Sequence, residues 1–198
     1  MKPWFYSLIA CLYRVFCALV HPVRIEGAQN VPDDGPVILC ANHKSAQDPF
    51  VVAAYLRRKV RFIAKKELFN NRIVGALAAS VGAFPVARGE NDISAIRTSL
   101  AVLKDGGVLG IFPEGHRYHD GQMHRAENGV SLIALRSKAA VIPAYIDGNY
   151  RMFKRITVTY GNPVDLSDFY GKMDAQTLSL ATDKIFGAML ELAEKDRK

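Results

Sequence analysis

The chain has 198 residues and a hydrophobic fraction of 49%, which is enough for one substantial core and points to a single domain rather than two. Its three cysteines form no even-numbered disulfide framework and lack the close pairing of a zinc or redox site, so they indicate reduced, cytosolic thiols. Lys and Arg outnumber Asp and Glu by 26 to 19, and the net charge of +7 favours an anionic partner without choosing among nucleic acid, an anionic bilayer, an acidic carrier protein and a phosphorylated substrate.

The first predicted element is an apolar helix from Pro3 to Val20. Lys2 precedes it, but the small-residue cleavage site of a secretory signal is missing before His21. Spanning a bilayer requires about 20 mainly apolar residues. This stretch is of borderline length and contains Arg14. We therefore expect a helix that lies at or partly in the membrane interface, with aromatic residues suited to the headgroup region: Trp4, Phe5, Tyr6 and Tyr13. A core helix of a soluble domain is the alternative.

Beyond this segment, short apolar runs alternate with longer helical patterns, which is typical of an α/β domain with a largely parallel central sheet flanked by helices. The expected strands cover residues 37–41, 60–64, 83–86, 107–112, 141–146 and 156–160. The expected helices cover residues 49–58, 72–80, 92–104 and 129–138, and a final helix carries the apolar stripe Leu178, Ile185, Met189 and Leu192. We therefore expect a membrane-associating segment, residues 1–21, followed by the α/β domain, residues 22–198. Because the sequence has no internal repeat or long linker, we expect this to be one domain.

The most informative segment runs from Asn42 to Pro49, between a buried strand and a helix, where α/β proteins place their sites. His43 is the side chain best able to take a proton from an alcohol near neutral pH, and Asp48 could orient the imidazole and stabilise its charged form. Backbone N–H groups at the start of the helix could serve as oxyanion donors. Taken singly, Asp48 is also typical of a helix N-cap, and His43 of a satisfied polar residue at a strand end.

A second cluster follows the strand expected at residues 107–112. Glu114, Gly115 and Arg117 join a carboxylate, a tight turn and a guanidinium at one point. Arg117 offers paired donors that suit a phosphate, and Glu114 could orient an arginine or accept from a glycerol hydroxyl. Arg88, after another short strand, could supply a second phosphate contact. The alternatives are an exposed turn with a surface ion pair and a lone surface arginine.

Four segments, taken together and in order, resemble the glycerophospholipid acyltransferase family, most closely its 1-acylglycerol-3-phosphate acyltransferases. They are Asn42-His43 with Asp48, Gly82 to Arg88, Phe112 to Arg117, and Val141 to Ala144. A single His-x4-Asp block occurs often by chance, but four blocks at family-like spacing are a specific signal. The chain departs from the family pattern at His116, where Thr or Ser is usual.

The resemblance implies transfer of a fatty acyl chain from an acyl-carrier-protein or coenzyme A thioester to the sn-2 hydroxyl of lysophosphatidic acid, giving phosphatidic acid. His43 would be the general base, Asp48 its orienting partner, and Pro143 part of the floor of the site. The phosphate and glycerol of the acceptor would be bound by Arg88, Glu114, Gly115 and Arg117. The resemblance implies a reaction without metal or other cofactor, and we expect it at the cytoplasmic face of the cell membrane.

Other interpretations stay open at this point. A nucleic-acid binder would use the net charge, but the aromatic residues cluster in the N-terminal helix instead of alternating with cations on a strand. A non-catalytic lipid-binding protein of the same fold would keep the N-terminus and the basic residues. A related acyltransferase acting on glycerol 3-phosphate or another lysolipid is the alternative among enzymes.

Two further groups of side chains bear on possible partners. A metal site is disfavoured at His116, His119 and His124, because no closely placed carboxylate or cysteine pattern joins them. A run of cations could attract anionic lipid or an acidic carrier, unless it is a solvated face: Arg57, Arg58, Lys59, Arg61, Lys65 and Lys66.

Overall fold

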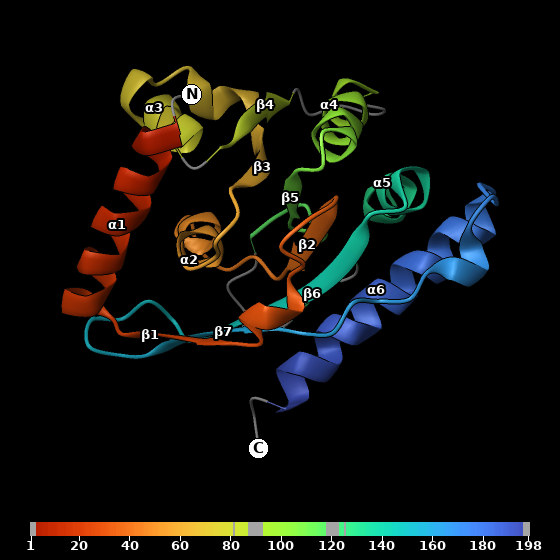
Figure 1. Cartoon of the computed structure of the whole chain (residues 1–198). Coiled ribbons are helices and arrows are strands. Elements are labelled where there is room, and N and C mark those ends of the chain that lie inside the picture. Colours follow the sequence, from red (N-terminus) through yellow and green to blue (C-terminus); the bar gives the residue numbers. More distant parts are fainter. Residues whose placement is uncertain (1–2, 81, 87–92, 118–122, 125, 196–198) are drawn as a thin grey trace.

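The computed structural model describes residues 3–80, 82–86, 93–117, 123–124 and 126–195. Within them, one seven-stranded sheet has the order β1-β7-β6-β2-β5-β3-β4 (Figure 1). Its strands are β1 (Val23–Glu26), β2 (Val37–Ala41), β3 (Val60–Lys65), β4 (Phe84–Val86), β5 (Val108–Ile111), β6 (Ala140–Asp147) and β7 (Ile156–Tyr160). The α-helices are α1 (Pro3–Val20), α2 (Asp48–Ala54), α3 (Arg72–Ser80), α4 (Ile93–Lys104), α5 (Gly129–Ser137) and α6 (Ala175–Lys195). Short 3-10 helices are η1 (Ala28–Asn30), η2 (Lys66–Phe69) and η3 (Ser167–Phe169).

The central strands are apolar runs, as expected of parallel strands that are covered on both faces. All five residues of β2 are buried. This strand pairs in parallel with β5 on one side and with β6 on the other. β3 and β4 continue the parallel order beyond β5. The carboxyl ends of β2, β5 and β6 therefore lie at one edge of the sheet, where open α/β sheets bind ligands.

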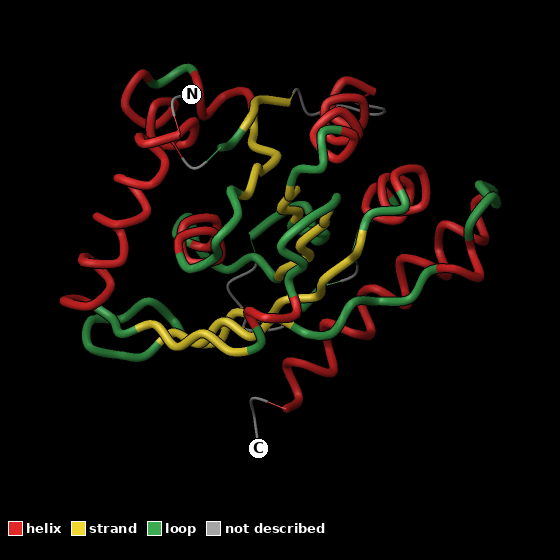
Figure 2. The backbone as a smooth tube through the Cα atoms, in the orientation of Figure 1, coloured by secondary structure: helices red, strands yellow, loops and turns green. Residues whose placement is uncertain are grey.

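Helices cover both faces of this sheet, and Figure 2 shows the strands between them. Successive side chains of a strand point to opposite faces, so β2 contributes to two separate cores. Ile38 and Cys40 pack with residues of α4, α5 and α6. Leu39 and Ala41 pack with residues of α2. Burial of apolar surface in these two layers is the main term that stabilises the fold.

The structure confirms the predicted fold class, an α/β domain with a largely parallel sheet flanked by helices. The strands at 37–41 and 156–160 and the helix at 72–80 have the predicted bounds. β1, which pairs in parallel with β7, was not predicted, and β7 runs antiparallel to β6. The helix expected at 49–58 ends at Ala54. Beyond it, the Arg58 guanidinium donates to carbonyl oxygens of other segments: Pro32, Gly35 and Gly106.

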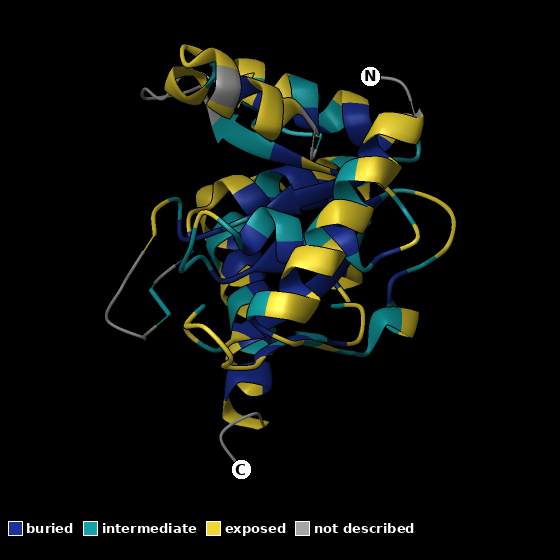
Figure 3. Cartoon of the chain, turned by 90° about the vertical axis from the view of Figure 1, so that its left-hand side faces the viewer, coloured by how far each residue is buried: buried dark blue, intermediate teal, exposed yellow. Residues whose placement is uncertain are grey.

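α1 packs on the domain with one face and exposes the other (Figure 3). On the inner face, Tyr6 and Cys17 are buried, and Val60 N donates to the Tyr6 hydroxyl (3.3 Å). Arg14 Nε donates to Ala54 O at the end of α2 (2.5 Å). The outer face exposes large apolar side chains at helical spacing: Trp4, Phe5, Leu8, Leu12, Val15, Phe16 and Leu19. In the part of the chain that the structure describes, no helix combines the length and the hydropathy needed to cross a bilayer.

Candidate active site

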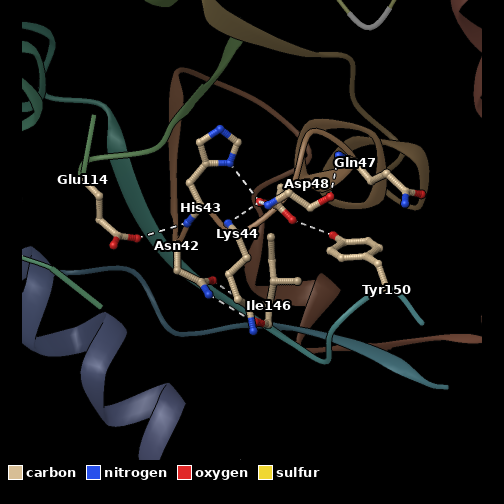
Figure 4. A network of polar contacts seen from close by, with 9 residues as sticks. Asn42, His43, Lys44, Gln47, Asp48, Glu114, Ile146 and Tyr150 are labelled. Atoms are coloured by element: carbon tan, nitrogen blue, oxygen red, sulfur yellow. Dashed lines mark hydrogen bonds and ion pairs between the residues drawn. The ribbon is translucent and has the colours of Figure 1, made fainter. Parts of the chain in front are cut away.

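The site begins where β2 ends, and Asn42 fixes this point (Figure 4). Its Nδ2 donates to Ile146 O (3.1 Å), and its Oδ1 accepts from Ile146 N (2.7 Å). Asn42 is buried, so both halves of its amide need partners, and β6 supplies them. The amide therefore ties the end of β2 to β6 and holds the next residue, His43, at the carboxyl edge of the sheet.

His43 and Asp48 form a hydrogen-bonded pair. Nδ1 of His43 lies 2.9 Å from Oδ2 of Asp48. An ionised carboxylate can only accept, so this partner assigns the ring proton to Nδ1 and leaves Nε2 to accept a proton from a substrate. The His43 side chain is 19% exposed, whereas the Asp48 side chain is fully buried. The pair thus has a buried orienting end and an accessible base, which is the arrangement that general-base chemistry requires.

The Asp48 carboxylate is held from several directions. Besides the contact with His43, Oδ2 accepts from Lys44 N (2.6 Å) and Ser45 N (2.7 Å). Oδ1 accepts from the Tyr150 hydroxyl (2.6 Å). These donors replace the water that a buried carboxylate loses. The N-cap interpretation of Asp48 is wrong, because Gln47 is the N-cap of α2 and the carboxylate accepts from N–H groups that precede the helix.

The Glu114 carboxylate accepts hydrogen bonds from backbone N–H groups, including that of His43. Its Oε1 accepts from His43 N (3.1 Å), and its Oε2 accepts from His124 N (3.0 Å). The side chain is buried, and burial raises the pKa of Glu114, although the two N–H donors oppose this change. These contacts support a bracing role between the ends of β2 and β5. A direct contact of Glu114 with an acceptor molecule stays a prediction.

An aromatic stack supports the imidazole on one side. The ring centroids of His43 and Phe112 lie 4.1 Å apart at an interplanar angle of 15°, and Phe112 stacks in turn on Phe62 at 5.6 Å. Gly110 on β5 makes room for this stack, because a Cβ at that position would overlap the Phe62 ring. Packing of Phe62 on β3 and of Phe112, just after β5, therefore fixes the orientation of the His43 ring together with Asp48.

Tyr150 is a site residue that the sequence did not reveal. It lies in the loop between β6 and β7 with φ 54°, a conformation uncommon for a bulky residue. Burial, reinforced by the negative charge of Asp48, raises the pKa of Tyr150, so its hydroxyl remains a donor to Asp48 at physiological pH. The Gly148-Asn149 dipeptide signals a turn after β6, but this pattern does not indicate where the following side chain points.

Of the residues predicted to bind the phosphate of the acceptor, Gly115 and Arg117 lie within the described ranges. Gly115 turns the chain at φ 68° after β5, and Arg117 is exposed two residues later. Arg88 lies outside the described residues, and so does His119. Within the ranges described above, no group of three or more His, Cys, Asp or Glu side chains is arranged to hold a metal ion. The roles of the two arginines stay predictions.

The backbone N–H groups at the start of α2 that could serve as oxyanion donors are already bonded to carbonyl oxygens. Proline at position 49 has no N–H group. The neighbouring N–H groups donate to carbonyl oxygens at the start of the helix: Asp48 N to Ser45 O, and Phe50 N and Val51 N to Gln47 O. The first turn of α2 thus closes on itself and offers no spare donor of this set to a substrate.

Comparisons with known proteins match most of the chain. The acyltransferase family model matches residues 22–147. The 1-acyl-sn-glycerol-3-phosphate acyltransferase of Bacillus subtilis (strain 168) is 28% identical over 196 residues, 96% of this chain and 98% of that protein. The protein of the same name from Streptococcus pneumoniae (strain ATCC BAA-255 / R6) is 32% identical over 172 residues, 83% of this chain and 63% of that protein. The fold is similar to the crystal structure of the 1-acyl-sn-glycerophosphate (LPA) acyltransferase PlsC from Thermotoga maritima, with a TM-score of 0.71 and 23% identity over 96% of this chain and 78% of that chain.

Proposed function

The chain belongs to the acyltransferase family, and on that premise we propose that it transfers a fatty acyl chain from an acyl thioester to the sn-2 hydroxyl of 1-acylglycerol-3-phosphate, giving phosphatidic acid. The His43–Asp48 pair carries this proposal, because it presents an oriented and accessible base for a hydroxyl group. The similar proteins from Bacillus subtilis and Streptococcus pneumoniae are named 1-acyl-sn-glycerol-3-phosphate acyltransferases, which supports the choice of acceptor.

In the proposed reaction, Nε2 of His43 takes the hydroxyl proton while the hydroxyl oxygen attacks the carbonyl carbon of the thioester. The new C–O bond forms and the carbonyl electron pair moves to oxygen. When the carbonyl forms again, the C–S bond breaks, and the leaving thiolate takes the proton from the imidazolium. Asp48 keeps the imidazole in the correct tautomer and stabilises its charged form. This scheme uses no metal ion or other cofactor, and Arg88 and Arg117 would bind the acceptor phosphate.

We further propose that the enzyme works at the cytoplasmic face of the cell membrane, with the outer face of α1 in the membrane interface. The stripe of large apolar side chains on α1 and the fixing of Arg14 to α2 support this placement. A lysolipid could then reach His43 without drawing its acyl chain through water. Of the cations expected to attract lipid, Arg57 is highly exposed, whereas the Arg58 guanidinium is bonded to carbonyl groups. Recovery of the chain in the soluble fraction of lysed cells would contradict this placement.

The acceptor is tested by offering the purified protein a labelled acyl thioester with lysophosphatidic acid, glycerol 3-phosphate or lysophosphatidylcholine. We expect labelled phosphatidic acid and little product from the other two acceptors, because the predicted arginine contacts suit a phosphate monoester. Parallel reactions with acyl-carrier-protein and coenzyme A thioesters identify the donor. If product forms only with glycerol 3-phosphate, that molecule is the acceptor in place of lysophosphatidic acid. If no acceptor is acylated, the result favours the alternative function, a non-catalytic lipid-binding protein of the same fold.

Replacing Tyr150 by Phe removes the hydroxyl that donates to Asp48 and keeps the ring that packs against His21. We expect kcat to fall roughly 10- to 100-fold with little change in KM, because Tyr150 positions the carboxylate and is not expected to contact substrate. Steady-state kinetics checks both. Tyr170→Phe, which removes the same atom on the turn before α6, is the control, and equal effects in the two variants would argue against the positioning role.

A further inference from the structure

The loop between β6 and β7, residues 148–155, exposes two large apolar side chains at its tip. Met152 is 66% exposed and Phe153 is 75% exposed. Adjacent apolar side chains of this size in water indicate a contact surface. Phe153 N donates to Val20 O (2.6 Å), so the tip lies at the C-terminal end of α1. In Figure 1 the loop extends to the same side of the molecule as α1. The tip therefore continues the apolar outer face of α1 beyond Leu19.

Three cations flank this apolar pair, and residues 148–155 include no acidic side chain. Arg151, Lys154 and Arg155 are all exposed. Large apolar side chains with adjacent cations suit the boundary between anionic headgroups and acyl chains, where the apolar groups enter and the cations meet phosphates. An acidic protein would also attract the cations. However, the continuity of the tip with the outer face of α1 favours a partner that extends over both, which a bilayer does.

The tip has a fixed shape before any partner binds. Phe153 lies at φ 59°, in the left-handed region that is sterically unfavourable for a bulky residue. Hydrogen bonds hold the loop in this shape, with Lys154 N donating to Arg151 O (3.0 Å) and Ile156 N donating to Pro22 O (2.9 Å). A surface that is already ordered loses little conformational entropy on binding.

We propose that the 148–155 loop is a second membrane contact, in which Met152 and Phe153 enter an anionic bilayer and the three cations meet its phosphate groups. The inference deepens the proposed function and rests on it only in placing the enzyme at a membrane. Tyr150 belongs to the same loop and donates to Asp48, so the proposed membrane contact lies on the segment that positions the catalytic carboxylate.

The test uses the whole chain with Met152→Gln and Phe153→Asn, since Asn tolerates the left-handed region. Affinity for phosphatidylglycerol vesicles, measured by cosedimentation, should fall about tenfold or more when the apolar pair is lost. Replacing Arg151, Lys154 and Arg155 by Gln should weaken binding roughly fivefold for each cation and remove the preference over phosphatidylcholine vesicles. The control is Met173→Gln with Leu180→Gln, two side chains 41% and 50% exposed near the start of α6, which should bind as the parent does.

A second readout follows the tip itself. The chain has one tryptophan, so Trp4→Phe with Phe153→Trp places a single fluorophore in the loop, and lipids with brominated acyl chains should quench it. An unquenched fluorophore in vesicle-bound protein would overturn the proposal, and so would unchanged vesicle affinity of the Gln and Asn variant. If the loop variants bind vesicles normally but are slower only with the acyl-carrier-protein thioester, and not with the coenzyme A thioester, the loop contacts that acidic protein instead. Vesicle binding is also measured in His43→Ala protein, so its outcome is independent of whether the proposed reaction occurs.

Discussion

Replacing His43 by Ala is expected to lower kcat for acyl transfer by roughly 10²- to 10⁴-fold, the usual contribution of a general base. His43 is paired with Asp48 through Nδ1, which leaves Nε2 for the hydroxyl proton. The variant has no group at that point to take up the proton during attack on the thioester. Initial rates with labelled thioester and lysophosphatidic acid measure the loss.

The control for this variant separates chemistry from packing. The His43 ring stacks on Phe112, so its removal also leaves a gap beside β5. His43→Phe fills the gap and lacks the base, and it should be as inactive as the alanine variant. Both variants should keep the vesicle affinity of the parent protein, because the outer face of α1 is unchanged. Transfer at the parent rate in either variant would rule out His43 as the base.

Replacing Asp48 by Asn is expected to lower both the rate and the stability. The carboxylate accepts from His43, Tyr150 and two backbone N–H groups through its two oxygens. Asn offers one oxygen, and its NH₂ group would face donors in place of the other. We expect kcat to fall roughly 10²- to 10⁴-fold, as for a misoriented catalytic imidazole. The free energy of unfolding should fall by about 1–3 kcal/mol, the cost of buried donors left unsatisfied.

Urea denaturation and initial rates check the two parts of this prediction. Asp168→Asn, at an exposed carboxylate in η3, makes the same chemical change at the surface and should alter the free energy of unfolding by less than about 0.5 kcal/mol. An Asp48→Asn protein as stable as the parent would show that the observed contacts do not hold the carboxylate in solution.

Much of the fold could be predicted because the hydrophobic pattern is unambiguous in its centre. The run Val37–Ala41 is wholly apolar and buried, as a central parallel strand requires. His43 and Asp48 could be paired from sequence because both lie at one turn between a strand and a helix. In contrast, β1 is a short strand with mixed polarity, and this pattern does not distinguish an edge strand from a loop.

The parts of the site that were missed depend on long-range contacts. Tyr150 reaches Asp48 across 102 positions of sequence, and the left-handed backbone that turns it inward has no marker in its residue type. Glu114 was predicted from its motif, but a motif does not reveal whether a carboxylate faces a ligand or backbone N–H groups. Its direction follows from the parallel pairing of β2 with β5, which places the segments after the two strands side by side.

The backbone of Phe153 has a consequence for engineering. A bulky residue at φ 59° is disfavoured there by about 1–2 kcal/mol, and glycine would relieve this strain. Directed evolution for heat tolerance alone is therefore expected to select glycine at this position. That substitution removes the Phe153 ring, which we propose as a membrane contact. Libraries of this enzyme should be screened for vesicle binding as well as for residual activity after heating. Variants that gain thermal stability but lose membrane affinity are then recognised.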